Sequence, residues 1–108
     1  MEAFAVPIKP GKVETWKSFV GELTGSRQAD FDELNARMGL TMHAAWLQEN
    51  PDGSSLVVVV QDGPGAPEFL TKLAASENEI DAWFRSMVAD IHPLDFSGPL
   101  PPPNQRFA

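Results

Sequence analysis

The chain has 108 residues, of which 43% are hydrophobic and 21% charged, so it fits one small globular domain with a modest core. A formal net charge of −7 argues against nucleic acid as a partner, because phosphates are bound by clustered Lys and Arg. The absence of cysteine excludes disulfides, thiolate metal sites and thiol nucleophiles. The longest apolar run, residues 56–60, is too short to cross a membrane, and we expect a cytoplasmic protein of bacterial type.

The N-terminal half begins with an apolar run at residues 3–8 that Pro10 and Gly11 end, which predicts an edge strand and a turn. From Val13 to Leu23 the large apolar residues recur at helical offsets, and Gly25 is a fitting stop. Asp30 is expected to cap a further helical stretch that ends at Gly39.

A β-hairpin is predicted in the middle of the chain. Residues 41–49 are expected to be extended, and Asn50-Pro51-Asp52-Gly53 is a strong turn signal. The strand at residues 56–60 contains four consecutive valines, a pattern typical of strands buried on both faces.

Two helices are predicted after the hairpin. Pro67 suits the first turn of a short helix. Ser76 and Glu79 have the spacing of a capping box. The apolar residues from Ile80 to Ile91 follow offsets of 3 and 4 throughout, and Pro93 ends this helix.

The C-terminal stretch, residues 93–108, contains five prolines but also four large apolar residues. A disordered tail seldom carries so many apolar side chains, so we expect an extended arm that packs on a surface, held by Leu94, Phe96 and Phe107. The predicted organisation is an α+β domain over residues 1–98 and a proline-rich arm over residues 99–108.

The order of elements, strand-helix-strand-strand-helix, matches the split βαβ plan of ferredoxin-like folds. Such a fold places helices on one face of an antiparallel sheet and leaves the other face open. Because the valine run is apolar on both faces, we expect two copies to pack sheet against sheet. The predicted fold is therefore α+β, a ferredoxin-like sheet with helices on one face that forms a dimeric α/β barrel as a homodimer.

The opening residues 4–12, with Trp16 and Phe19, resemble the first strand and helix of dimeric α+β barrel proteins. That superfamily includes antibiotic-biosynthesis-type monooxygenases and stress-responsive barrel proteins. A closer resemblance is to a family of uncharacterised bacterial domains, carried by Trp-Leu-Gln at 46–48, Trp-Phe-Arg at 83–85, Ile-His-Pro-Leu-Asp-Phe at 91–96 and the proline-rich ending. The second resemblance implies a fold but no activity. The prolines depart from the barrel plan, because they leave no clear fourth strand.

The candidate ligand-binding residues are Trp46, His43, Gln48 and His92. Period-two alternation puts His43 and Trp46 on opposite faces of their strand, with Gln48 on the face of Trp46. One of these faces is expected to line a cavity, where an imidazole can act as a base or bind a ligand. The structural alternatives are a hydrogen-bonded strand histidine at His43 and a helix end at His92.

The other polar residues suggest no chemistry. Arg85 and Asp81 are expected to form a surface pair, and Asp95 can orient His92. No residue is identified as catalytic, and the spacing of the two histidines suggests no metal site and no cofactor.

Two functional hypotheses follow, and the sequence does not decide whether the chain is an enzyme. The first is a structural or interaction domain whose cavity is filled by its own side chains. The second, motivated by the monooxygenase resemblance, is a cofactor-independent enzyme or a binder of a small apolar molecule in the barrel cavity. The expected partners are a second copy of the chain and a small apolar molecule, with no nucleic acid and no membrane.

Overall fold

Three antiparallel strands form the one sheet of the computed structural model, which describes residues 1–108. They are β1 (Glu2–Pro7), β2 (Met42–Glu49) and β3 (Ser55–Asp62), and β3 lies between the other two. β2 and β3 pair as the predicted hairpin, and β1 pairs along its full length with residues 56–61 of β3. The valine run is therefore the central strand, where β-branched side chains suit the pleated backbone.

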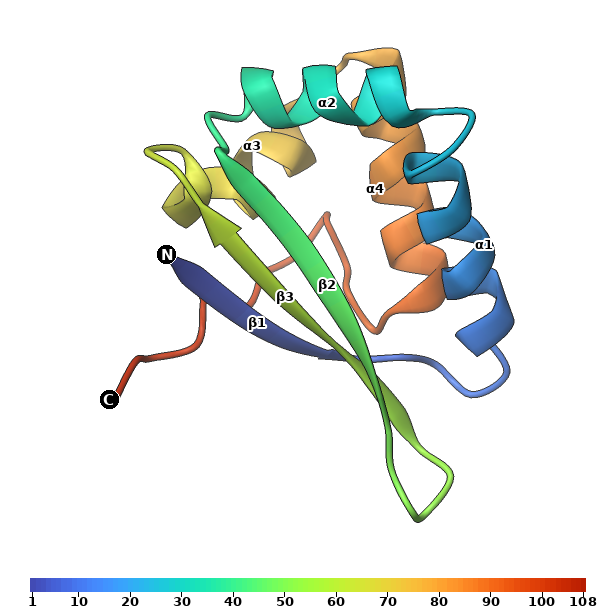
Figure 1. Ribbon diagram of the computed structural model, residues 1–108. Coiled ribbons are helices and arrows are strands. Elements are labelled where there is room, and N and C mark those ends of the chain that lie inside the picture. Colours follow the sequence, from blue (N-terminus) through green and yellow to red (C-terminus); the bar gives the residue numbers. More distant parts are fainter.

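All the helices lie over one face of this sheet (Figure 1). They are α1 (Val13–Leu23), α2 (Gln28–Arg37), α3 (Phe69–Ala75), which follows a short 3₁₀ turn (Ala66–Glu68), and α4 (Glu79–Ile91). α4 packs against each of the other three. The α+β class is thus confirmed, with four helices on a three-stranded antiparallel sheet.

The core occupies the space between the sheet and the helices. Its aromatic centre includes Phe19, whose ring centroid lies 5.5 Å from Trp83 and 5.2 Å from Phe84. The predicted apolar stripes of α1 and α4 thus face the same interior. The buried cluster consists of Ile8, Phe19, Leu23, Leu34, Met38, Leu40, Val57, Ala66, Phe69, Leu73, Phe84 and Ile91.

The helix starts differ from the predicted ones. Instead of a capping box of Ser76 and Glu79, α4 uses Asn78 as its N-cap, and Asn78 Oδ1 accepts from the N–H of Ile80 at 3.1 Å. The Ser76 hydroxyl lies before the helix, where it donates to Asp81 Oδ2 at 2.6 Å and accepts from the N–H of Asn78 at 3.2 Å. α2 begins at Gln28, so Asp30 lies within its first turn rather than before it.

Two glycines let the loops after α2 and β3 touch. The N–H of Gly65 donates to the carbonyl of Gly39 at 3.0 Å, and a Cβ on Gly65 would collide with the carbonyl of Met38. Gly39 itself has a φ of 73°, which favours glycine. The Gly63-Pro64-Gly65 segment is thus a tight β-to-α connection.

The chain after His92 runs as an arm, without helix or strand, beside the free edge of β1 (Figure 1). The N–H of Asn104 donates to the carbonyl of Ala3 at 2.7 Å, and Phe96 packs against the core. Proline has no N–H to donate, so the proline-rich arm cannot pair with β1 as a fourth strand. The expected contact of Phe96 is thus present, but Phe107 does not hold the arm, because that side chain is 89% exposed. The boundary between residues 98 and 99 stays a prediction.

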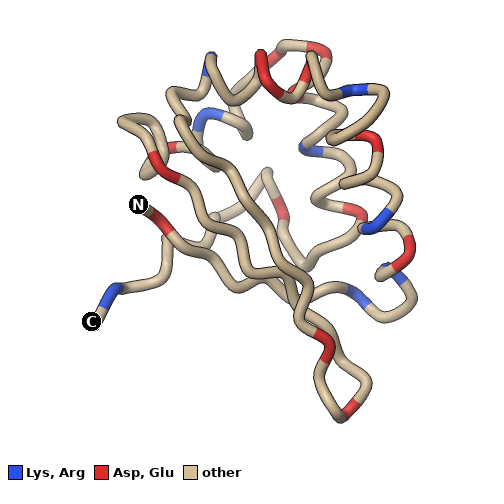
Figure 2. The backbone as a smooth tube through the Cα atoms, viewed as in Figure 1, with Lys and Arg blue, Asp and Glu red and all other residues tan.

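The outer face of the sheet carries no helix. Cross-strand neighbours Ala5, Val58 and Trp46 form one apolar row on it, and Trp46 is 54% exposed. Charged residues occur only at the strand ends, so the middle of the face is uncharged (Figure 2). No helix is both long enough and apolar enough to span a bilayer.

Candidate functional site

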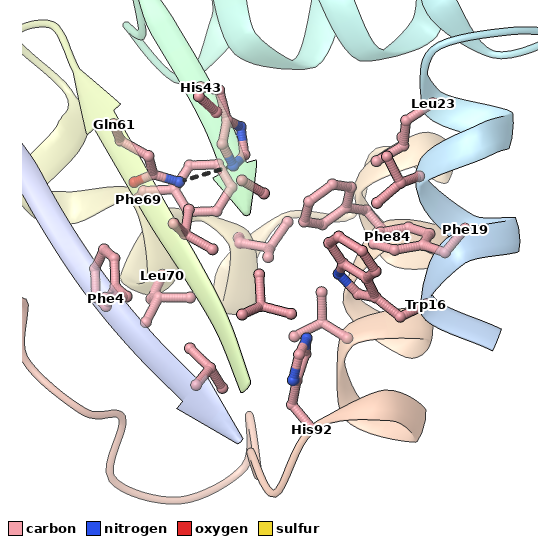
Figure 3. Close-up of a pocket in the computed structure, with 18 of the residues that line it drawn as sticks. Phe4, Trp16, Phe19, Leu23, His43, Gln61, Phe69, Leu70, Phe84 and His92 are labelled. Carbon is pink, nitrogen blue, oxygen red and sulfur yellow. Dashed lines mark hydrogen bonds between the residues drawn. The ribbon is translucent and has the colours of Figure 1, made fainter. Parts of the chain in front are cut away.

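A cavity of about 400 Å³ lies between the inner face of the sheet and the helices. Of its 22 lining residues 17 are hydrophobic, and none is Asp, Glu, Lys or Arg. Figure 3 shows the side chains of β1, β2 and β3 pointing toward those of α1, α3 and α4 across this space. The aromatic residues of the wall are Phe4, Trp16, Phe19, Phe31, Phe69 and Phe84.

His43 is the polar residue that β2 places in this wall. Its ring centroid lies 5.3 Å from both Phe31 and Phe69. His43 Nδ1 is 2.9 Å from Asn35 Oδ1, and His43 Nε2 is 3.2 Å from Gln61 Nε2. A carbonyl oxygen can only accept and an amide nitrogen can only donate, so the imidazole carries its proton on Nδ1 and accepts at Nε2.

The surroundings of His43 keep it neutral at pH 7. Burial among apolar rings penalises the imidazolium and lowers the pKa of His43 to about 4. Both ring nitrogens are also engaged in hydrogen bonds. The ring is thus a fixed neutral element of the wall.

Gln61, on β3, is the one residue with a buried side-chain polar atom that lacks a partner. Its side chain lines the cavity, and the residue is 2% exposed. Its amide nitrogen donates to His43, but Gln61 Oε1 accepts no hydrogen bond. An unsatisfied buried acceptor costs about 1–3 kcal/mol. A hydrogen-bond donor supplied from the cavity would remove that cost.

His92 forms the far end of the wall, where α4 ends. Its Nδ1 lies 2.8 Å from the carbonyl oxygen of Pro7 and therefore donates. Burial lowers the pKa of His92, and the ring is neutral at pH 7, which leaves a lone pair on Nε2. No side chain of the protein donates to that nitrogen. The indole of Trp16 and the imidazole of His92 point toward one another at this end (Figure 3).

The four predicted ligand-binding residues separate into two pairs. His43 and His92 both line the cavity. Trp46 and Gln48 lie on the opposite face of β2, both exposed, and Gln48 donates to Asn50 Oδ1. Their contact with a ligand in a lumen between two subunits stays a prediction.

Two residues of the cavity wall, Gln61 and Trp16, were not predicted as site residues from the sequence. Gln61 is polar at a position whose alternation with Val57 and Val59 marks the inner face, and this signal could have identified it. Trp16 was assigned to the core from its place on the helical stripe of α1. The side chain of Trp16 does point inward, but it lines the cavity instead of being packed on all sides.

The predicted surface pair of Asp81 and Arg85 does not form. Asp81 is completely buried and forms two hydrogen bonds of 2.7 Å with Arg37, which lower its pKa. Arg85 instead donates to the carbonyls of Leu73 and Ser76, at the end of α3. The expectation that Asp81 lies at the surface is therefore wrong.

The predicted link between His92 and Asp95 is also absent. His92 is bound to Pro7, while Asp95 accepts from the backbone and hydroxyl of Ser97. No three His, Asp or Glu side chains lie in an arrangement that could hold a metal ion.

Comparison with known proteins gives no relative from which to infer the role of this cavity. No protein-family model, no curated protein and no solved structure matches the chain. The chemistry of the cavity wall is therefore the basis for the functional proposal.

Proposed function

We propose that this protein binds a small, uncharged, apolar molecule in the cavity between the sheet and the helices. The observation that carries the proposal is the 400 Å³ space, walled by 17 hydrophobic residues and by no charged one. Ligand pockets are typically 300–1,000 Å³ and mostly apolar, with a few placed polar groups. Gln61 and His92 are such groups here.

Binding, rather than a reaction, is what the polar residues of the wall support best. At pH 7 His43 is neutral and has both nitrogens in hydrogen bonds, so it is poorly placed to take a proton from a ligand. Thr24 is the one hydroxyl residue in the wall, and it donates to the carbonyl of Val20 on its own helix. Neither group has the partner that would activate a nucleophile.

Uncharged aromatic compounds are expected to raise the melting temperature. A ligand present at 100 times its Kd stabilises the folded state by about 2.7 kcal/mol, which corresponds to a rise on the order of 10 °C for a chain of this size. The same compounds are expected to quench tryptophan fluorescence through Trp16. A screen of neutral one- and two-ring compounds by thermal shift and fluorescence measures both effects.

Three variants identify the site of binding. Trp16→Phe is expected to abolish the ligand-dependent change in fluorescence, and Trp46→Phe, on the other face of the sheet, is the matched control that keeps it. Val59→Phe places a larger side chain in the cavity and is expected to weaken binding at least tenfold while the protein stays folded. The proposal is wrong if no compound in the screen shifts the melting temperature, or if Val59→Phe binds as well as the wild type.

A second proposed property is homodimerisation through the outer face of the sheet, which would assemble a dimeric α/β barrel. The support is the apolar row of Ala5, Val58 and Trp46, in which Ala5 and Trp46 are exposed and Val58 is half-buried, on a face that no helix covers. Covering such a face is favourable by roughly 25 cal/mol for each Å² of apolar surface removed from water. A second copy is the fitting cover, because twisted sheets pack face to face and a twofold axis pairs the same apolar face of both copies.

Light scattering at micromolar concentration is expected to give the mass of two chains. Trp46→Glu places a charge in the centre of the outer face and is expected to give the mass of one chain. Thr71→Glu introduces the same charge on an exposed position of α3 and is expected to leave the dimer intact. A wild-type protein that is monomeric and well folded at this concentration excludes the paired-sheet arrangement.

A further inference from the structure

We propose that the molecule bound in the cavity is uncharged and carries a hydrogen-bond donor toward each of its two ends, one for Gln61 Oε1 and one for His92 Nε2. This inference rests on the proposed binding function and narrows its ligand class. It follows from two acceptor atoms that receive no hydrogen bond from the protein, and from the positions of these atoms in the cavity wall.

Both acceptors belong to buried residues, but only Gln61 Oε1 is itself closed to water, whereas His92 Nε2 keeps some access to it. Gln61 is 2% exposed and His92 is 6% exposed, yet each keeps one acceptor atom that no protein donor satisfies. The opposite atom of each side chain is held in place, by His43 for Gln61 and by the carbonyl of Pro7 for His92. The protein thus fixes the orientation of both acceptors, a feature of sites that recognise a donor.

The acceptors lie at opposite ends of the cavity. In Figure 3 Gln61 and His43 lie at the sheet end near Phe69, whereas His92 rises from the end of α4. Aromatic and aliphatic side chains occupy the wall between them. A ligand that satisfies both acceptors therefore has an apolar middle and two polar ends.

The indole of Trp16 influences which polar group of a ligand suits the His92 end of the cavity. Its N–H makes no hydrogen bond within the protein and faces the imidazole of His92 (Figure 3). A hydroxyl group between them can donate to His92 Nε2 and accept from Trp16 Nε1. A hydroxyl therefore satisfies this end better than a group that only donates.

Charge and size narrow the class further. No Lys or Arg lines the cavity, so an anionic ligand would lose its hydration without gaining a counter-charge. The volume of 400 Å³ equals that of about 13 water molecules at roughly 30 Å³ each. A two-ring diol is of that size, and flat rings suit the aromatic wall.

The test is a fluorescence titration at pH 7 with biphenyl, biphenyl-4-ol, biphenyl-4,4′-diol and biphenyl-4,4′-dicarboxylate. Each hydroxyl is expected to tighten binding by about tenfold, so that the diol binds about a hundredfold better than biphenyl. The dicarboxylate is expected to bind at least a hundredfold more weakly than the diol, because the wall offers no cation.

Two variants assign each hydroxyl to its acceptor. Gln61→Met and His92→Phe each remove one acceptor and put an apolar side chain of similar size in its place. Each is expected to abolish the gain from one hydroxyl and to leave the Kd of biphenyl within about threefold. If a variant does not fold, the wild-type series alone decides the ligand class.

Each outcome has a distinct meaning. Equal affinity for biphenyl and the diol overturns the ligand class but leaves the proposed binding function standing. A hydroxyl gain that persists in both variants also overturns it, because the donors would then be bound elsewhere. Failure of every compound, including those of the neutral screen, overturns both proposals.

Discussion

Replacing Asp81 with asparagine is expected to lower the free energy of unfolding by about 3 kcal/mol. Asp81 is completely buried, and its carboxylate forms two hydrogen bonds of 2.7 Å with Arg37 and one of 2.6 Å with Ser76. Breaking a buried ion pair by changing one partner costs about 3–5 kcal/mol, because the other charge loses its compensation. We place the loss at the lower limit because Arg37 keeps partial access to water.

The matched control is Glu33→Gln. Glu33 also lies near Arg37, at 3.6 Å, but its side chain is 64% exposed, so its removal is expected to change stability by less than about 0.5 kcal/mol. Urea unfolding at pH 7 measures both variants. Equal losses for the two would show that the pair of Asp81 and Arg37 does not join α2 to α4 as we infer.

Mild acid is expected to destabilise the protein through the protonation of His43 in the unfolded state. The pKa of His43 is about 4 in the folded protein and about 6.5 in the unfolded chain, so the unfolded state binds the proton more readily. The contribution of neutral His43 is complete above pH 6.5 and is lost as the pH falls toward 4. The total loss is about 3 kcal/mol, of which about 2 kcal/mol falls between pH 7 and pH 5.

Urea unfolding at several pH values separates His43 from other groups. The aspartates with lowered pKa values, including Asp81, lose their contributions below about pH 4, outside this window. His43→Phe is expected to remove most of the slope between pH 7 and pH 5, although it also lowers stability at every pH by leaving Asn35 without its partner. In His92→Gln the free energy of unfolding is expected to keep the part of its pH dependence that is due to His43. An unchanged slope in His43→Phe would contradict the assignment.

Local pattern predicted the elements well. The apolar spacing between Ile80 and Ile91, the Pro-Asp-Gly turn and the valine run each depend on residues close in sequence, and each formed as expected. The capping box failed because two candidate caps, Ser76 and Asn78, lie close together. Asn78, directly before α4, caps the N–H of Ile80, and Ser76 accepts instead from the N–H of Asn78 and donates to the buried carboxylate of Asp81.

The candidate site was predicted only in part, because its properties depend on distant residues. Alternation gives β2 two faces, but it does not say which one meets the helices, and so His43 and Trp46 were equal candidates. The pair of Asp81 and Arg37 joins residues 44 apart in sequence, which no local pattern reports. The cavity is a volume left between side chains, and only their packing defines it.

The arm beside β1 has a consequence for solubility. An exposed strand edge is a template on which another chain can add a strand, and proteins commonly protect such edges. Here the arm shields the edge with Pro99 and the three prolines at 101–103, which cannot themselves donate to a further strand. No strand of another chain can therefore pair with the sheet at the β1 edge. The arm thus protects one of the two sheet edges, that of β1, against edge-to-edge aggregation, while β2 forms the other edge.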